Sequence, residues 1–244
     1  MEALACQIIA EERAYLVLAK PAGLICHSDG RTEEPSVAIW LAERYPEMRT
    51  VGEPWVSPQG ERVPIAGLAH RLDRTTSGVL IVARSPEMWR HLRAEFAARR
   101  IAKEYRAIIH GHTDAESGRI VAEVARGGVP KRWYAKPREE GHRRAAVTNW
   151  HVLAQGDAGG EPCAELALIP ETGRTHQLRV HLASIGHPLV GDHLYASGRD
   201  PLFGFARPAL HAAAIAFTLP GGERVRYAAP LPPDWPTLTD SQFS

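Results

Sequence analysis

The sequence has little net charge, few cysteines and no long hydrophobic run. Its 29 Lys and Arg residues nearly balance 28 Asp and Glu residues, and the net charge of +1 argues against a polycation that coats nucleic acid non-specifically. No apolar stretch approaches the roughly 20 residues that a membrane helix requires, and the N-terminal region is acidic where a secretory signal would be basic. The 3 cysteines lie far apart, which favours a reducing cytoplasm over a disulfide framework. These absences predict a cytoplasmic, globular protein that does not enter a membrane.

The motifs of several enzyme classes are also absent. Neither GxxxxGK[ST] nor GxGxxG occurs, so the sequence offers no phosphate cradle to a nucleotide-dependent enzyme. Ser77 lies in TTSGV, which is not the GxSxG elbow of a hydrolase. Histidines are frequent, but their spacing does not put ligands on one helical face and no HExxH occurs. The histidines in question are His176, His181, His187, His193 and His211. We interpret them as structural and expect no metal and no cofactor; a metal-dependent hydrolase is the alternative.

Basic residues gather locally in spite of the neutral total. Residues 84–106 carry seven Lys and Arg against three Glu, and residues 126–144 carry seven against two. Such a run can be a solvated face or a contact for phosphate groups.

Strand and helix patterns follow one another without the regular rhythm of βαβ units. Apolar runs predict strands at residues 15–20, 79–83, 105–109, 146–153, 164–169 and 211–219. Helical spacing and start signals predict helices at 35–45, from Ser85 past Phe96, and at 175–185. Loops are expected at 46–64 and 127–141. The pattern favours an α+β fold with a mixed, largely antiparallel central sheet flanked by helices and loops. No linker divides the chain, so we expect a single domain over residues 1–244 with its core at about 15–230.

The stretch HRLDRTTSG, residues 70–78, precedes an apolar run and holds a single carboxylate. Asp73 lies there between Arg71 and Arg74. An exposed aspartate is ionised at neutral pH, and so placed it can be a nucleophile, a metal ligand or half of a structural ion pair. The stretch alone leaves these three roles open.

A second polar stretch, GRTHQLRVHLASIGHPLVGD, covers residues 173–192. On the expected helix Leu178 and Leu182 lie four residues apart and share the core face. Arg179 then leaves the helix beside apolar neighbours, where its charge is costly unless a carboxylate meets it. Asp73 and Asp192 are both candidates for that carboxylate.

These two stretches resemble motifs of the RluA-type pseudouridine synthases. HRLDRTTSG resembles the catalytic motif HRLDxxTSG, and residues 173–192 resemble the C-terminal motif. Three shorter elements agree in order: KPAGL at 20–24, KEY at 103–105 and LHA at 210–212. The resemblance extends from about Tyr15 to Pro230. It begins so near the first residue that we expect no N-terminal RNA-binding domain.

The resemblance implies that a monomer isomerises uridine to pseudouridine in ribosomal or transfer RNA without metal, cofactor or energy source. Asp73 is then the essential aspartate, either as a nucleophile or as the base that deprotonates the sugar. Tyr105 stacks on the target uracil, and Arg179 pairs with Asp73. An RNA-binding protein that keeps the fold without the chemistry is the alternative from another class.

The resemblance also implies how RNA is held. Extruding a nucleotide costs a few kcal/mol, and stacking repays about 1–3 kcal/mol per base. Arg71 enters the RNA in place of the extruded nucleotide, and Leu178 lines the pocket. The other predicted substrate-binding residues are His70, Thr76 and Arg74, of which Arg74 is a phosphate contact or a surface charge. RNA selection falls to the two loops at 46–64 and 127–141, where Trp133 and Tyr134 either stack on bases or anchor their loop.

Overall fold

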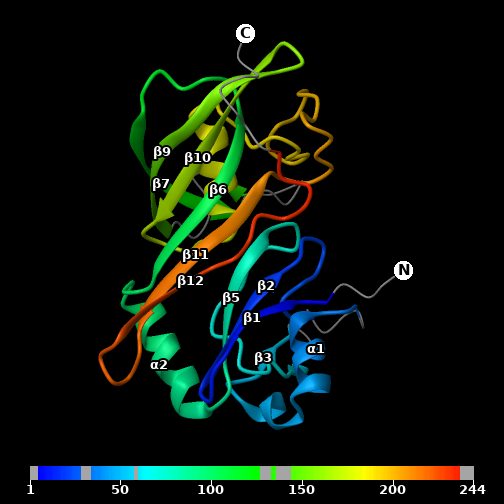
Figure 1. Ribbon diagram of the computed structural model, residues 1–244, viewed down its shortest axis with the longest axis vertical. Coiled ribbons are helices and arrows are strands. Elements are labelled where there is room, and N and C mark those ends of the chain that lie inside the picture. The colour runs from blue at the N-terminus through cyan, green and yellow to red at the C-terminus, as the bar shows by residue number, and fades with distance from the viewer. Residues whose placement is uncertain (1–4, 29–33, 58–59, 127–132, 136–143, 237–244) are drawn as a thin grey trace. The chain divides into compact units, whose positions relative to one another are not determined.

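The computed structural model describes residues 5–28, 34–57, 60–126, 133–135 and 144–236 (Figure 1). The chain divides into two compact units. Unit 1 comprises residues 1–102 and 212–232, and unit 2 comprises residues 103–211 and 233–244. Largely antiparallel strands with few helices confirm the predicted α+β fold. A single domain over residues 1–244 stays a prediction.

Unit 1 contains a sheet in the order β1-β2-β5-β11-β12. Its strands are β1 (Gln7–Glu11), β2 (Tyr15–Lys20), β5 (Ser77–Ala83), β11 (Leu210–Thr218) and β12 (Arg224–Ala228). All residues of β5 are buried, which explains its uninterrupted apolar sequence, because a strand covered on both faces does not alternate. The strands predicted at 15–20, 79–83 and 211–219 are confirmed within one or two residues.

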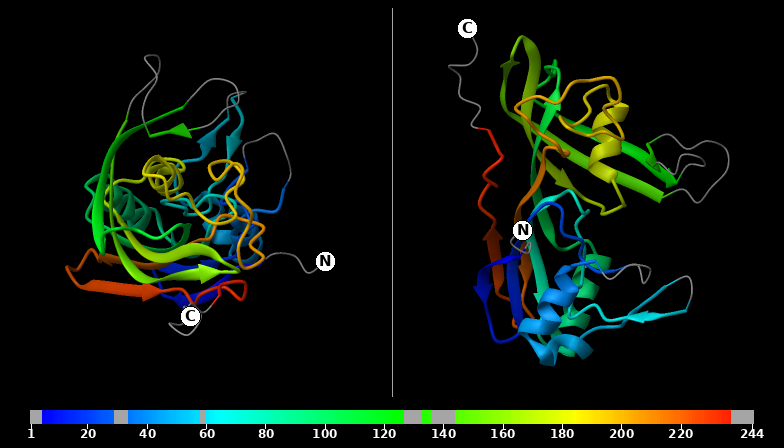
Figure 2. Two further views of the ribbon diagram at one scale, coloured as in Figure 1. Left: turned by 90° about the horizontal axis from the view of Figure 1, so that it is seen from above. Right: turned by 90° about the vertical axis from the view of Figure 1, so that its right-hand side faces the viewer.

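Two capped helices lie on one face of the unit 1 sheet (Figure 2). In α1 (Val37–Arg44) the Ile39 amide donates to Ser36 Oγ at 3.2 Å. In α2 (Pro86–Ala97) the Met88 amide donates to Ser85 Oγ at 3.2 Å. Each cap satisfies an amide at the helix start and contributes about 1 kcal/mol. Both helices confirm their predictions, since a serine cap followed by apolar residues at helical spacing is a local signal.

The segment 46–64, predicted as a loop, is more ordered than its composition indicates. It forms the 3-10 helix η1 (Pro46–Thr50) and a small hairpin of β3 (Trp55–Val56) and β4 (Arg62–Val63). Met48 and Val51 are 0% and 4% exposed, so two apolar side chains anchor this segment among its Pro, Gly and charged residues.

Unit 2 contains an antiparallel sheet in the order β6-β10-β9-β7-β8. Its strands are β6 (Ala102–His110), β7 (Ser117–Arg126), β8 (Trp133–Tyr134), β9 (Arg144–Ala158) and β10 (Glu161–Pro170). The helix α3 (Gln177–Ser184) lies in the hollow of this curved sheet, as Figure 2 shows. Trp133 and Tyr134 pair with the end of β7, so they form a short strand; the rest of the predicted loop lies outside the described residues.

Strand β10 is buried on both faces, although its sequence alternates. Leu166 and Leu168 pack in one cluster with Leu178 and Leu182 of α3. Cys163 packs in another cluster that includes Trp235. Trp235 also covers Glu165 on this face, since its Nε1 donates to Glu165 Oε1 at 2.9 Å.

Candidate active site

Asp73 lies on a loop of unit 1 whose backbone is fixed on both sides. Leu72 is 5% exposed; its amide donates to Cys26 Sγ at 3.3 Å, and the thiol donates to the Leu72 carbonyl at 3.4 Å. On the other side the Thr76 amide donates to the Asp73 carbonyl at 3.1 Å and closes a turn. Asp73 itself is half-buried. The loop therefore holds its position while the aspartate keeps partial exposure, the arrangement that a reacting group needs.

Lys20 of the KPAGL element ties a second turn to this loop. It is 1% exposed, and its Nζ donates to three carbonyl oxygens at 2.8 to 3.2 Å. These belong to Pro21, Leu24 and Arg74. The Gly23 amide adds a 2.8 Å bond to the Arg74 carbonyl. A buried ammonium group is tolerated only when it is hydrogen-bonded, so these contacts explain the lysine. The spacing of residues in the sequence did not predict this role for Lys20. A lysine at the end of an apolar strand is nonetheless unusual and could have indicated it.

Gly78 closes the HRLDRTTSG motif where β5 begins. Its φ is 120°, and a Cβ at this position would lie 2.2 Å from the carbonyl oxygen of Ala212 in β11. Only glycine permits this approach of the two backbones. The HRLDRTTSG and LHA motifs, known from the sequence only by their order, therefore meet at this point.

His70 and Thr76 make contacts inside the protein. The Ile81 amide donates to His70 Nε2 at 3.0 Å, and the His70 ring stacks on Phe96 with centroids 4.6 Å apart. Thr76 is 2% exposed. These contacts support a positioning role for both residues, and the predicted contact of each with substrate stays a prediction.

The two arginines beside Asp73 differ in their contacts. Arg74 NH1 lies 2.6 Å from Glu34 Oε2 in a surface ion pair, which favours the surface-charge interpretation. Arg71 is exposed, and within the described ranges it makes no hydrogen bond or ion pair. Its guanidinium is therefore available to a ligand.

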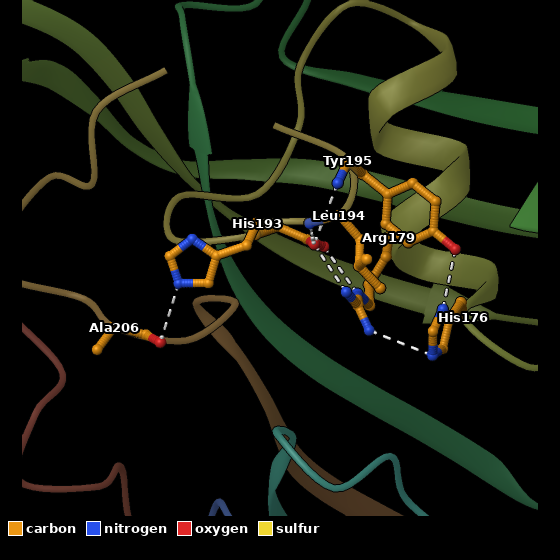
Figure 3. Close-up of polar contacts among 7 residues, drawn as sticks. His176, Arg179, His193, Leu194, Tyr195 and Ala206 are labelled. Atoms are coloured by element: carbon orange, nitrogen blue, oxygen red, sulfur yellow. Dashed lines mark hydrogen bonds and ion pairs between the residues drawn. The ribbon is translucent and has the colours of Figure 1, made fainter. Parts of the chain in front are cut away.

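Arg179 of unit 2 is held by a buried carboxylate, as Figure 3 shows. Its Nε and NH2 donate to the two oxygens of Asp192, each at 2.7 Å, and the side chains are 6% and 0% exposed. The guanidinium also lies 5.0 Å from the ring centre of Tyr195. A two-pronged charged pair at this distance is among the stronger hydrogen-bonded contacts in proteins. The Asp192 alternative predicted for Arg179 is thus confirmed.

His176 contacts both Arg179 and Tyr195, and these contacts determine which of its ring nitrogens carries the hydrogen. Arg179 NH1 lies 3.3 Å from His176 Nε2, and a guanidinium can only donate, so Nε2 accepts. The other ring nitrogen, Nδ1, then donates to the hydroxyl of Tyr195 at 2.9 Å. His176 has a left-handed φ of 55° and stands directly before α3.

Gln177 fixes the start of α3 to the sheet. Its Oε1 accepts from the Thr172 hydroxyl at 2.7 Å and from the Arg174 amide at 3.0 Å. Its Nε2 donates to the Val147 carbonyl at 3.0 Å and to Thr148 Oγ1 at 3.1 Å. The amide group is thus fully used, and it orients the helix that carries Arg179. The motif matched by resemblance contains Gln177, but spacing alone did not single it out.

Tyr105 and Leu178 belong to the same apolar region of unit 2. Tyr105, half-buried on β6, packs against the apolar cluster that contains Leu178. Two residues before Tyr105, Lys103 directs its Nζ to the Thr172 carbonyl at 3.5 Å. Burial lowers the pKa of Lys103 to about 8, a value at which the charged ammonium form still predominates at pH 7.

The histidines once considered as metal ligands have separate partners. His181 Nδ1 lies 3.0 Å from Thr148 Oγ1, and burial lowers the pKa of His181 to about 4. His187 and His193 lie near backbone carbonyls, the latter that of Ala206 in Figure 3. His211 is buried near the ring of Trp235. Within the described part of the chain no three His, Cys, Asp or Glu side chains gather as metal ligands.

Comparison with known proteins decides the family. Residues 14–184 match the RNA pseudouridylate synthase family. The chain belongs to this family. It is 33% identical over 243 residues to the ribosomal large subunit pseudouridine synthase D of Zymomonas mobilis, covering 95% of this chain and 71% of that protein. It is 34% identical over 223 residues to the dual-specificity RNA pseudouridine synthase RluA of Vibrio vulnificus, covering 90% and 80%.

A solved structure agrees with this assignment. Human RNA pseudouridylate synthase domain containing 1 superposes with a TM-score of 0.74 at 27% identity, covering 99% of this chain and 89% of that chain. The predicted membership in the RluA-type family is confirmed, and the enzyme is an RNA pseudouridine synthase, an isomerase that acts on RNA. None of its described helices has the length and apolar content needed to span a membrane.

The predicted site residues of the enzyme divide between the two units. Asp73 belongs to unit 1, whereas Tyr105, Leu178 and Arg179 belong to unit 2. The predicted pairing of Arg179 with Asp73 joins the two units and stays a prediction. The residues that sequence reasoning left without a role, Lys20 and Gln177, position the loop of Asp73 and the helix of Arg179.

Proposed function

We propose that this pseudouridine synthase modifies a specific uridine of ribosomal or transfer RNA, with Asp73 as its catalytic carboxylate. The main support for this proposal is the structure of the HRLDRTTSG loop. Its aspartate is half-buried, and its backbone is fixed by contacts of Leu72, Lys20 and Gly78. The relative named for the ribosomal large subunit supports ribosomal RNA as the substrate class. The three cysteines are free and buried, which supports a proposed cytoplasmic location, and we propose a monomer.

The reaction is an isomerisation, so every atom of the uridine is kept. The bond between N1 of uracil and C1′ of ribose breaks, the ring turns, and a bond forms between C5 and C1′. The proton on C5 is lost and N1 gains one, which leaves the formula unchanged. Asp73 either attacks the sugar or removes a proton from it. In this proposal Tyr105 stacks on the uracil, and Arg179 pairs with Asp73 and orients its carboxylate.

The RNA backbone is bound by positive charge in this proposal. Arg90 and Arg93 lie exposed on α2, and Arg71 is exposed on the Asp73 loop. Phosphate contacts release counterions, so affinity falls steeply as salt increases.

The test is the variant Asp73→Asn, which removes the charge and keeps the shape. We expect wild-type folding and nearly intact RNA binding, with pseudouridine formation on total cellular RNA abolished. Asp114→Asn is the matched control, because Asp114 is an exposed aspartate elsewhere in the chain, and it should retain full activity. Turnover by the Asp73→Asn variant would disprove the catalytic assignment. Mapping pseudouridines in RNA from cells with and without the protein identifies the target uridine.

A further inference from the structure

Unit 1 holds a cavity of about 330 Å³ next to the Asp73 loop. Its lining includes the rings of His27, Trp55 and Trp89 and the guanidinium groups of Arg71 and Arg93. The volume lies at the lower end of the range of about 300–1,000 Å³ found for small-molecule sites, so the cavity suits one heterocycle. Asp73 is not among its lining residues.

The cavity has one aromatic wall that is held in place, Trp89, and one that is partly exposed, Trp55. Trp89 Nε1 donates to the Leu68 carbonyl at 3.1 Å, and a Cβ on Gly52 would lie 2.7 Å from the same nitrogen, so the Trp89 indole is held in place. Trp55, on the β3–β4 hairpin, is half-buried beside His27, with ring centroids 5.5 Å apart. Its neighbour Val56 is 56% exposed. This half of the cavity therefore offers a flat apolar surface to a ligand.

The charges at the cavity favour an anion. Arg71 is exposed, and Arg93 NH1 donates to the Ala69 carbonyl at 3.3 Å, which directs its guanidinium to this region. Glu53 is the one carboxylate among the lining residues that the structure describes. Guanidinium groups bind phosphate through parallel hydrogen bonds.

His27 supplies a hydrogen-bond acceptor. Its Nδ1 lies 2.8 Å from the Ser28 carbonyl, which can only accept, so Nδ1 carries the hydrogen. Burial and the charge of Arg71 lower the pKa of His27, which keeps the ring neutral with Nε2 as an acceptor. An aromatic surface, two cations and an acceptor for N–H match the face, the phosphate and the edge of a nucleotide.

We propose that this cavity binds an unpaired nucleotide that neighbours the target uridine, with its base on Trp55 and its phosphate at Arg93. The inference rests on the proposed function, because Asp73 marks where the target uridine goes. Arg71 and Asp73 are two residues apart, so their Cα atoms are at most about 7 Å apart. An RNA strand whose target reaches Asp73 thus brings a neighbouring nucleotide to the cavity.

The test measures binding of fluorescein-labelled heptauridylate by anisotropy at fixed salt, with the full chain. Trp55→Ala should raise the dissociation constant about 5- to 150-fold, since it removes one stacked base. Trp55→Phe should stay within about threefold because it keeps an aromatic face. Arg62→Ala is the matched control: Arg62 pairs opposite Val56 on the same hairpin, is exposed and does not line the cavity. It should bind as wild type. A blunt RNA duplex, which offers no unpaired base, should bind Trp55→Ala and wild type alike.

Two results would overturn the proposal. In one, folded Trp55→Ala binds heptauridylate as wild type does; in the other, it loses affinity for the duplex by the same factor. If Trp55→Ala does not fold, His27→Ala asks the same question. Because binding is measured without turnover, the result is independent of Asp73→Asn. Activity in that variant would disprove the catalytic assignment and leave the cavity result standing.

Discussion

Asp73 in unit 1 and Arg179 in unit 2 are held in position by different kinds of contact. Asp73 is half-buried, and its loop is fixed through backbone contacts to Lys20, Cys26 and Thr76. Arg179 is buried, and its own guanidinium is held by Asp192. A group that must meet a substrate can be positioned through the backbone of its loop. A buried charge needs a partner.

The largest expected effect comes from breaking the buried pair. Asp192→Asn removes the buried carboxylate that holds the Arg179 guanidinium at two points, and such losses typically cost about 3–5 kcal/mol. We expect the free energy of unfolding, measured by urea titration, to fall by about this amount. Replacing both residues, with Arg179→Met and Asp192→Leu, should cost less than Asp192→Asn alone, because no buried charge is left.

The control for this experiment is a surface pair in the same unit. Arg207 NH2 lies 2.8 Å from Asp234 Oδ1, but the Asp234 side chain is 50% exposed. Asp234→Asn should cost at most about 1 kcal/mol, since water and salt screen the pair. Equal costs at Asp192 and Asp234 would contradict the assignment of Arg179 to a buried, charge-dependent cluster.

A smaller loss of unfolding free energy is expected for a substitution in unit 1. Lys20→Met removes the ammonium that three carbonyls share, and water at the loop can replace part of those bonds. We expect a loss of about 2 kcal/mol in unfolding free energy and a lower turnover rate, because the Asp73 loop loses an anchor. Arg13→Met is the matched control at the opposite end of β2, where Arg13 is exposed. Wild-type turnover by Lys20→Met would show that the loop keeps Asp73 in place without this lysine.

Local signals in the sequence predicted much of the fold. A run such as YLVLAK, or a serine followed by Pro and Glu, determines a strand or a helix start within a few residues, and β2 and α2 begin as expected. Helix α3 begins at Gln177 and not at Thr175, because His176 adopts a left-handed conformation and the Gln177 side chain bonds to the Arg174 amide. That detail depends on contacts with the sheet, which periodicity does not contain.

The sequence motifs predicted which residues belong to the candidate site, but not the contacts that these residues make. Asp73 and Arg179 could be selected as charged residues in unusual surroundings, but the contact of Arg179 with Asp192 needed coordinates. The cavity beside the Asp73 loop could not be predicted, since its walls come from the hairpin, the loop and α2, and from His27 far from all three in sequence.

The smallest effect is expected at the surface ion pair next to Asp73. Arg74 and Glu34 form an ion pair at 2.6 Å, with side chains that are 50% and 38% exposed. Glu34→Gln should lower the unfolding free energy by only about 0.2–1 kcal/mol, because exposed pairs gain little over hydration. If Arg74 is a surface charge, RNA affinity should hardly change. If loss of this ion pair instead strengthens RNA binding with a steeper salt dependence, Arg74 is a phosphate contact that Glu34 restrains.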